Sequence, residues 1–184
     1  MVRCAEYIWD NIIIADEANT TKQYAKKAQV GVDLSVREIR PFLEAGYTLK
    51  GKTYAAKTEA LEKIEFEAPD GNTYRGYFIP KGSYILTLNE GCKFGPNDTG
   101  YIILRSSLNR SAVSVCSAVW DPGYHSINED GSVYPMSIRL TVENEHGFYL
   151  EENSRVAQLI VFENENAALY SGQWQGGATT SKLV

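Results

Sequence analysis

The sequence predicts a mainly β fold, in which short strands form a distorted jelly roll or β-barrel with a few short helices. The first observation is that apolar stretches of strand length recur through the second half of the chain. The second is that polar segments rich in Asn, Asp, Gly and Pro separate them and supply turns. Short strands at this spacing are typical of all-β barrels and sandwiches.

Five segments carry this strand prediction, residues 83–88, 101–104, 112–116, 136–142 and 156–162. The fourth alternates most regularly. It places Ile138, Leu140 and Val142 on one face and polar side chains on the other, as a half-buried strand does.

Two segments predict helices, residues 20–28 and residues 53–64. In the second, Ala56, Ala60, Leu61 and Ile64 recur at helical spacing. The charged stretch 46–77 is expected to form an insertion or a lid rather than core.

Length and composition restrict the class of protein. With 184 residues, the chain is expected to form a single domain over residues 1–184. The 18 Lys and Arg against 23 Asp and Glu argue against non-specific nucleic-acid binding. No apolar run is long enough to cross a bilayer, and residues 1–28 lack the apolar centre of a secretory signal, so we expect a cytoplasmic protein without a membrane partner. The cysteines Cys4, Cys92 and Cys116 lack metal-ligand spacing and are expected to be reduced, inert thiols.

The densest group of chemically active side chains lies between Arg105 and Tyr124. Arg105, Ser106, Ser107 and Arg110 combine two guanidiniums and two hydroxyls, a set that suits phosphate oxygens. Asp121 follows and can orient or activate a water molecule. We therefore expect the phosphate-holding and water-activating groups to lie within one hairpin's reach. Solvated surface charge for the arginines, and a turn-initiating role for Asp121, are the structural alternatives.

Four motifs stand in a characteristic order along the chain. They are Gly-Val-Asp-Leu at 31–34, Arg-Ser-Ser-Leu at 105–108, Asp-Pro-Gly-Tyr at 121–124 and Arg-Val-Ala-Gln-Leu-Ile at 155–160. This order resembles the dUTPase and dCTP deaminase superfamily. The tail at 170–177, Tyr-Ser-Gly-Gln-Trp-Gln-Gly-Gly, is similar to the closing segment of its deaminase-like branch. Residues 30–182 carry the resemblance.

The resemblance implies a β jelly-roll subunit of the dUTPase type and a homotrimer with sites at subunit contacts. It also implies a deoxypyrimidine nucleoside triphosphate substrate, dUTP or dCTP, bound with Mg²⁺. The last segment, residues 165–184, would close over the nucleotide, unless it is only a frayed terminus.

By the same resemblance, individual residues acquire roles. Arg105, Ser106, Ser107 and Arg110 would cradle the triphosphate. Asp121 would hold the attacking water and contact the 3′-hydroxyl of the sugar.

Tyr124 would lie under the deoxyribose, where its ring excludes a 2′-hydroxyl; packing in the core is the alternative. Backbone groups of residues 118–120 would read the base edge. Trp120 replaces the aliphatic residue usual before the Asp, so the pocket is expected to differ there.

The resemblance extends to three residues of the first and last motifs. Gln158 would bind a phosphate oxygen or the water, unless it is a buried structural amide. Arg155 would support a subunit contact or a neighbouring carboxylate. Asp33 would act indirectly on the metal or be structural.

The tail adds three further candidates. Tyr170 or Trp174 would lie near the base, and Gln175 near the phosphates.

One position separates two activities. Deaminases of this superfamily carry a proton-shuttling Glu three residues before an Asn at the end of a strand, and counting back from Asn144 gives Thr141. A Thr hydroxyl is too weakly acidic for general-base work. Glu143 shares its strand face, however, and the additional residues 125–134 leave room for a two-residue shift.

Three hypotheses therefore remain, a dUTP pyrophosphatase, a dCTP deaminase that is bifunctional or not, and a non-catalytic nucleotide sensor. The first is favoured. His125 and His146 are far apart without further ligand partners, which argues against a zinc-dependent deaminase.

Overall fold

The fold was analysed in a computed structural model, which describes residues 1–16, 18–19, 30–50, 52–165, 167–172 and 175. The helical elements of this part are the α-helix α1 (Ala5–Asn11) and the 3-10 helix η1 (Leu108–Ser111). The strands are β1 (Ile13–Ile14), β2 (Val32–Pro41), β3 (Tyr47–Leu49), β4 (Lys52–Tyr54), β5 (Ile64–Glu67), β6 (Thr73–Ile79), β7 (Gly82–Leu88), β8 (Gly91–Cys92), β9 (Asp98–Leu104), β10 (Val113–Cys116), β11 (Ser137–Val142), β12 (Phe148–Glu151) and β13 (Arg155–Glu163).

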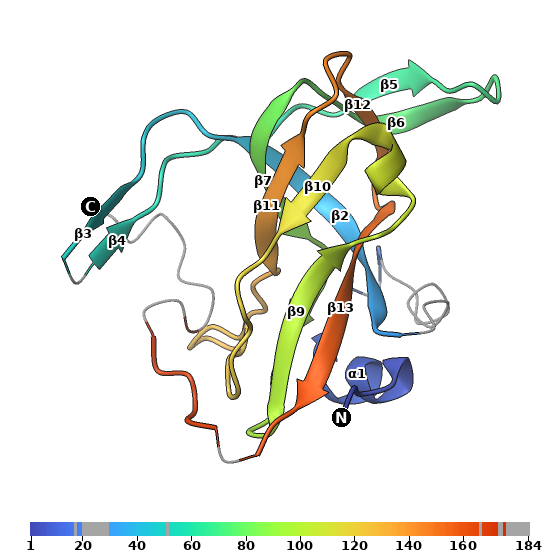
Figure 1. The fold of residues 1–184 in the computed structure, drawn as a ribbon. Coiled ribbons are helices and arrows are strands. Elements are labelled where there is room, and N and C mark those ends of the chain that lie inside the picture. The colour runs from blue at the N-terminus through green and yellow to red at the C-terminus, as the bar shows by residue number, and fades with distance from the viewer. Residues whose placement is uncertain (17, 20–29, 51, 166, 173–174, 176–184) are drawn as a thin grey trace.

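Six strands form one antiparallel sheet in the order β10-β11-β7-β2-β13-β9. The sheet curls until its ends meet, because the segment after β10 returns to β9. There Gly100 and Trp120 exchange both backbone hydrogen bonds at 2.9 Å, and the Ser117 hydroxyl accepts one from the Ile102 amide at 3.1 Å. The result is a nearly closed barrel (Figure 1), which confirms the predicted fold class.

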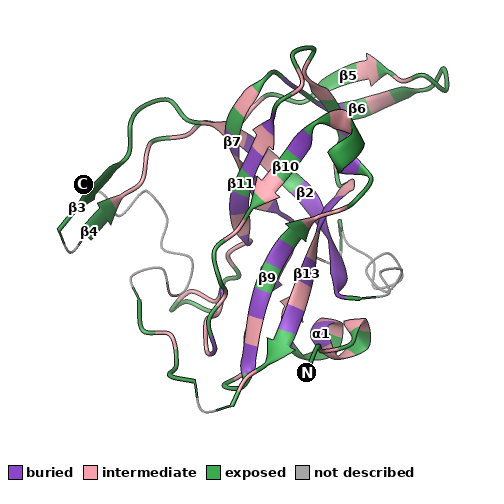
Figure 2. Ribbon diagram, in the orientation of Figure 1, coloured by how far each residue is buried: buried purple, intermediate pink, exposed green. Residues whose placement is uncertain are grey.

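The core fills the barrel through alternate side chains. On β11 the residues Ile138, Leu140 and Val142 are buried, whereas Arg139 is exposed, as the sequence predicts. The predicted strands 83–88, 101–104, 112–116 and 156–162 are also present, with ends shifted by up to three residues. Buried residues alternate with partly or fully exposed ones along β9, and with partly exposed ones along β13 beyond its bulge (Figure 2).

A second sheet, β12-β6-β5, covers one end of the barrel. Its inner face contributes Tyr77, Ile79 and Leu150 to the core. Tyr77 is 1% exposed, so the expectation that residues 46–77 lie outside the core is wrong at their C-terminal end. The rest of the range includes the β3–β4 hairpin, which projects away from the barrel (Figure 1).

The helix expected at 53–64 is wrong. Thr53 belongs to β4, and Ile64 begins β5. Between them the backbone forms hydrogen bonds with other segments instead of with itself. The Leu61 amide donates to the Ile39 carbonyl at 2.8 Å, and the Lys57 carbonyl accepts from the Leu43 amide at 2.9 Å. Pairing with β2 and the chain that follows it thus satisfies the backbone and overrides a helical pattern built on two alanines. The helix expected at 20–28 lies outside the described residues.

The short helix α1, which the sequence analysis missed, packs on the barrel through Ile8, which is fully buried. None of the helices in the described ranges has the length and hydropathy needed to cross a membrane.

Candidate active site

Asp33 connects three of the four motifs. Its Oδ2 accepts a hydrogen bond from Arg155 Nη1 at 2.8 Å and lies 3.3 Å from Arg105 Nε. Its Oδ1 accepts one from Gln158 Nε2 at 2.8 Å. The side chain of Asp33 is only 2% exposed, so this carboxylate is buried but compensated by two guanidiniums and an amide.

A β-bulge brings two of these donors together. Arg155 and Gln158 are three residues apart and would point to opposite faces of a regular strand. The β2–β13 register shifts between Arg155 and Ala157, and this extra residue turns both side chains towards Asp33. The neighbouring carboxylate expected for Arg155 is therefore Asp33.

The loop after β9 presents the predicted phosphate ligands. Leu108 is buried and anchors η1, whereas Ser106, Ser107 and Arg110 are exposed. Among the described residues, none bonds the guanidinium of Arg110. Ala112 ends η1 in the left-handed region, with φ 53°, and returns the chain into β10. The loop thus offers two hydroxyls and a cation to solvent.

Asp121 begins a tight turn beside the start of β9. Its carbonyl accepts the Tyr124 amide at 3.1 Å, and Gly123 has φ 78°, which a side chain would strain. The carboxylate of Asp121 is exposed and has no partner among the described residues. It is therefore available to a water molecule or a ligand.

The ring of Tyr124 lies in an aromatic cluster. The ring centroid of Trp120 is 5.0 Å away and that of Tyr170 is 5.4 Å away, both nearly perpendicular. Burial raises the pKa of the Tyr124 hydroxyl, so it stays protonated. Tyr170, from the tail, thus lies against the residue expected to hold the sugar.

The tail contacts the Asp121 turn in three places. The Tyr170 amide donates to Pro122 at 2.8 Å, and Gln175 Nε2 donates to Gly123 at 3.0 Å. Leu169 packs on Gly123, 3.2 Å from where a β-carbon would lie, and no sequence signal indicates this contact. Trp174 lies outside the described residues.

Within the described part of the chain, two buried polar atoms near this turn have no hydrogen-bond partner, Trp120 Nε1 and Gln175 Oε1. The first is a donor and the second an acceptor. An unpaired buried group costs about 1–3 kcal/mol, so a ligand that pairs with both atoms would recover this free energy.

The backbone of Trp120 is not free to read a base edge, because Gly100 binds both its amide and its carbonyl. The expectation for residues 118–120 is therefore wrong at Trp120. Any backbone reading of the base falls to Ala118 and Val119.

One chain does not bring the arginines and Asp121 together. Trp120 pairs with Gly100, whereas Arg105 follows the other end of β9. Asp121 continues away from Arg105, so about six residues of strand, on the order of 20 Å, separate them. The expectation that both groups lie within one hairpin's reach is wrong for a single chain.

Strand β11 places Thr141 and Glu143 near the loop that follows β9 and carries Arg105 and Arg110, called the arginine loop below (residues 105–110). Thr141 pairs with Ser114 and Ser83, and its hydroxyl is 3.4 Å from that of Ser83. Glu143 follows the strand, is exposed, and donates its amide to Ala112 at the end of η1.

The donor set bears on the expected metal. The described residues contain no group of three His, Cys, Asp or Glu side chains that could hold an ion. Asp33, the expected indirect ligand, is already bound by three donors. Mg²⁺ often binds through substrate phosphates with only one or two carboxylates. The residues present therefore suit a metal that arrives on a triphosphate.

The nearly closed antiparallel barrel and the order of the motifs along it define the class as dUTPase-like. The chain belongs to the dCTP deaminase-like family, whose model matches residues 4–164. The family that the motif order indicates is thereby confirmed.

Relatives named probable deoxyuridine 5′-triphosphate nucleotidohydrolase occur in several archaea. The protein of Aeropyrum pernix is 35% identical over 79% of this chain and 82% of its own length. That of Methanosarcina acetivorans is 30% identical over 81% and 80%, and that of Halobacterium salinarum 28% over 83% and 84%.

A solved structure shares the fold. The 2′-deoxycytidine 5′-triphosphate deaminase of Agrobacterium tumefaciens superposes with a TM-score of 0.56 over 87% of this chain, at 12% identity. This chain spans 46% of that longer chain, and at such identity the similarity concerns the fold alone.

Proposed function

We propose that this protein hydrolyses dUTP to dUMP and pyrophosphate. The observation that carries the proposal is the carboxylate of Asp121, which is exposed on the motif turn beside Tyr124 and bonds none of the residues that the structure describes. The archaeal nucleotidohydrolases, up to 35% identical over most of the chain, support it.

The site would be completed by another copy of the chain, in a homotrimer. The support is the distance of roughly 20 Å between residues 105–110 and Asp121 in one chain, which is too long for Asp121 to act at the α-phosphorus while these residues bind the adjacent phosphates. The loop of one copy would then face the Asp121 turn of its neighbour across a heterologous interface.

The phosphates would lie against Ser106, Ser107 and Arg110, all exposed on one loop. Arg105 and Gln158 lie behind it, held by Asp33. Because donors held in place need no reorganisation, they stabilise charge that develops on the phosphates. Bound Mg²⁺ would offset further phosphate charge.

Asp121 would orient a water molecule for in-line attack on the α-phosphorus. The acceleration then comes chiefly from position and charge stabilisation rather than from a covalent intermediate. The ring of Tyr124 would lie under the deoxyribose and leave no space for a 2′-hydroxyl. The tail would lift, admit the nucleotide and close again, with Tyr170 over it.

The unpaired atoms support uracil as the base. Trp120 Nε1 needs an acceptor and Gln175 Oε1 needs a donor, so Gln175 would contact the base rather than the phosphates expected from the resemblance. The Watson–Crick edge of uracil offers carbonyl oxygens beside an N–H, so it can satisfy both.

The free thiols Cys4, Cys92 and Cys116 support a reducing compartment such as the cytoplasm.

Deamination of dCTP is the second candidate, because the Glu143 amide bonds the Ala112 carbonyl at the end of η1. This contact places a carboxylate that could shuttle protons close to Arg110. One experiment separates the two. The protein is incubated with Mg²⁺ and either dUTP or dCTP, and pyrophosphate and ammonia are followed separately. Pyrophosphate from dUTP alone is expected. Ammonia from dCTP would establish deamination, and unchanged dUTP despite binding would indicate a nucleotide sensor.

A further inference from the structure

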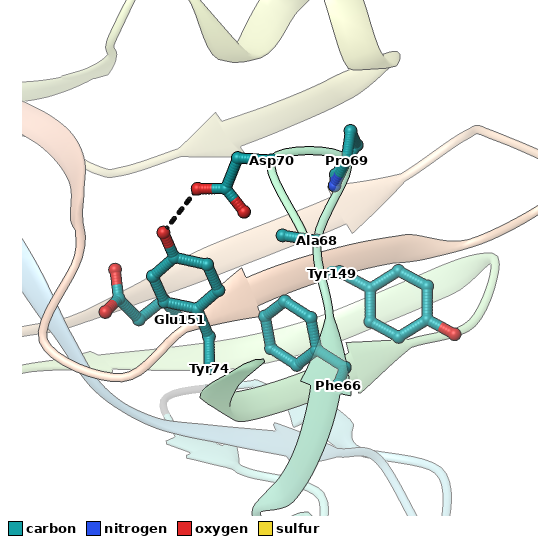
Figure 3. Close-up of a pocket in the computed structure, with 7 residues that line it drawn as sticks. All are labelled: Phe66, Ala68, Pro69, Asp70, Tyr74, Tyr149 and Glu151. Atoms are coloured by element: carbon teal, nitrogen blue, oxygen red, sulfur yellow. Dashed lines mark hydrogen bonds between the residues drawn. The ribbon is translucent and has the colours of Figure 1, made fainter. Parts of the chain in front are cut away.

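An aromatic pocket of about 460 Å³ lies on the outer face of the β12-β6-β5 sheet. This sheet is separate from the six strands that carry the candidate active site. The pocket is lined by Phe66, Ala68, Pro69, Asp70, Tyr74, Tyr149 and Glu151 (Figure 3).

Strand pairing assembles the rings of this pocket. Phe66 pairs with Tyr74 across β5 and β6, and Tyr149 pairs with Phe78 across β12 and β6. The ring centroids of Phe66 and Tyr149 are 5.0 Å apart, and those of Phe78 and Tyr149 are 4.9 Å apart. Four aromatic side chains from three strands therefore form one surface.

Gly76 lets two of these strands approach closely. It lies between Tyr74 and Phe78 on β6, where a β-carbon would come within 2.1 Å of the Leu150 carbonyl oxygen. Only glycine permits this approach of β6 to β12. The Leu150 carbonyl therefore occupies the place of a side chain between the rings of Tyr74 and Phe78.

Two carboxylates border the rings, as Figure 3 shows. Asp70 accepts a hydrogen bond from the Tyr74 hydroxyl at 2.6 Å and another from the Asn72 amide at 3.0 Å. The Tyr74 hydroxyl lowers the pKa of Asp70, so this carboxylate stays ionised at neutral pH. Glu151 also lies beside Tyr74, and the described residues that line the pocket include no lysine, arginine or histidine.

This combination has the chemistry of a cation site. Ring faces attract ammonium and guanidinium groups through their quadrupoles, and ionised carboxylates add direct attraction. The same charges repel a triphosphate, so the pocket does not serve the nucleotide.

We propose that the pocket binds the basic side chain, lysine or arginine, of a partner polypeptide. Apolar surface beyond the pocket favours a polypeptide over a free small cation. Ile64 is 41% exposed and Phe78 38%, and a bound chain would cover both side chains. β5 is also an edge strand of its sheet, with backbone groups that an extended partner can pair.

The proposal is tested on the full chain by TROSY NMR of ¹⁵N-labelled protein. The probes are acetyl-Gly-Lys-Gly-amide, the same peptide with norleucine in place of lysine, and spermidine. The lysine peptide should shift amides of β5, β6 and β12, with half-saturation at about 1 mM. The norleucine peptide keeps the aliphatic chain without the charge, so its shifts should be much smaller.

Variants locate the binding. Tyr149→Leu removes a ring and Asp70→Asn removes a charge, and each should weaken lysine-peptide binding by about threefold or more. Tyr47→Leu, an exposed tyrosine on the β3–β4 hairpin, is the matched control and should bind normally. All three variants should hydrolyse dUTP like the wild type, so this test and that of the proposed function are independent.

Three results would overturn the proposal. Equal shifts from the norleucine peptide would show that the surface binds aliphatic side chains and does not recognise a positive charge. Equal shifts from spermidine would show that the pocket binds a free small cation and not specifically the side chain of a polypeptide. No shifts in these strands at saturating peptide would leave no cation site.

Discussion

Trp120 and Gly100 exchange both backbone hydrogen bonds, each 2.9 Å long, and this bridge holds Asp121 at the opposite end of β9 from Arg105. Since a strand is nearly inextensible, a side-chain movement cannot close this distance. Under the proposed mechanism, Asp121 and Arg105 can act on the same phosphates only if they come from different copies.

Mixed assemblies test this consequence. Arg110→Ala and Asp121→Asn should each be inactive alone. When they are co-expressed with different tags and purified as mixed assemblies, about one quarter of the wild-type activity should return, because half of the copies supply each intact residue.

The control pairs Asp121→Asn with Tyr124→Ala, whose residues lie on the same turn. This mixture should stay inactive. A mixture of Arg110→Ala and Asp121→Asn that is verified as mixed but has no activity would place the site within one chain.

Asp121→Asn should abolish dUTP turnover while leaving nucleotide binding intact. The amide cannot accept a proton from water, but it keeps the shape of the exposed side chain. Pyrophosphate release and calorimetric binding of dUTP measure the two properties. Glu129→Gln, on an exposed turn nearby in sequence, should retain full turnover. Normal hydrolysis by Asp121→Asn would refute its role.

Asp33→Asn should lower both stability and catalysis. The change removes the charge that holds Arg105 and Arg155 and turns an N–H₂ group towards donors. We expect the free energy of unfolding in urea to fall by about 2 kcal/mol, since the two guanidiniums can regain some solvent. The kcat/KM for dUTP should fall as well, because Arg105 loses its orientation. Glu67→Gln, exposed on β5, should change stability by about 0.5 kcal/mol or less. An equal loss in that control would argue against a special role for Asp33.

Trp120→Phe should weaken dUTP binding about fivefold, the loss expected for one hydrogen bond from the indole Nε1 to the base. Binding is measured in the Asp121→Asn background, where the nucleotide is not consumed. Trp9→Phe, on α1, is the matched control and should bind like its parent. Unchanged affinity in Trp120→Phe would show that the base does not use this donor.

The thiols should divide into two classes. Cys4 and Cys116 are exposed, whereas Cys92 is buried and burial raises its pKa to about 12. At pH 8 a thiol reagent should therefore label two thiols quickly and the third only in denaturant. Rapid labelling of all three in the folded protein would contradict this burial.

The raised pKa of the Cys92 thiol also predicts how the stability of the protein depends on pH. The folded state keeps the Cys92 proton, whereas the unfolded thiol loses it near its ordinary pKa of 9.0. Stability from this group is therefore unaffected at neutral pH and falls as the pH rises above about 9. A Cys92→Ala variant should lack this part of the alkaline loss in urea titrations.

Much of the fold was predictable from local pattern. The alternation in 136–142 depends on neighbours two residues apart, and β11 follows it. The helix at 53–64 failed because its amides found partners in β2 and beyond, which no local pattern contains. The bulge at Arg155 was equally invisible, although it decides which side chains reach Asp33.

The amino-acid order alone was enough to identify the motifs, the superfamily and the types of group that would bind phosphate. These depend on residue identity and spacing, which are written in the chain. The folded structure decided that Asp33 binds Arg105, Arg155 and Gln158, and that Asp121 lies about 20 Å from the arginine loop. Such relationships arise from strand register and barrel closure, which join residues distant in sequence through many weak contacts at once.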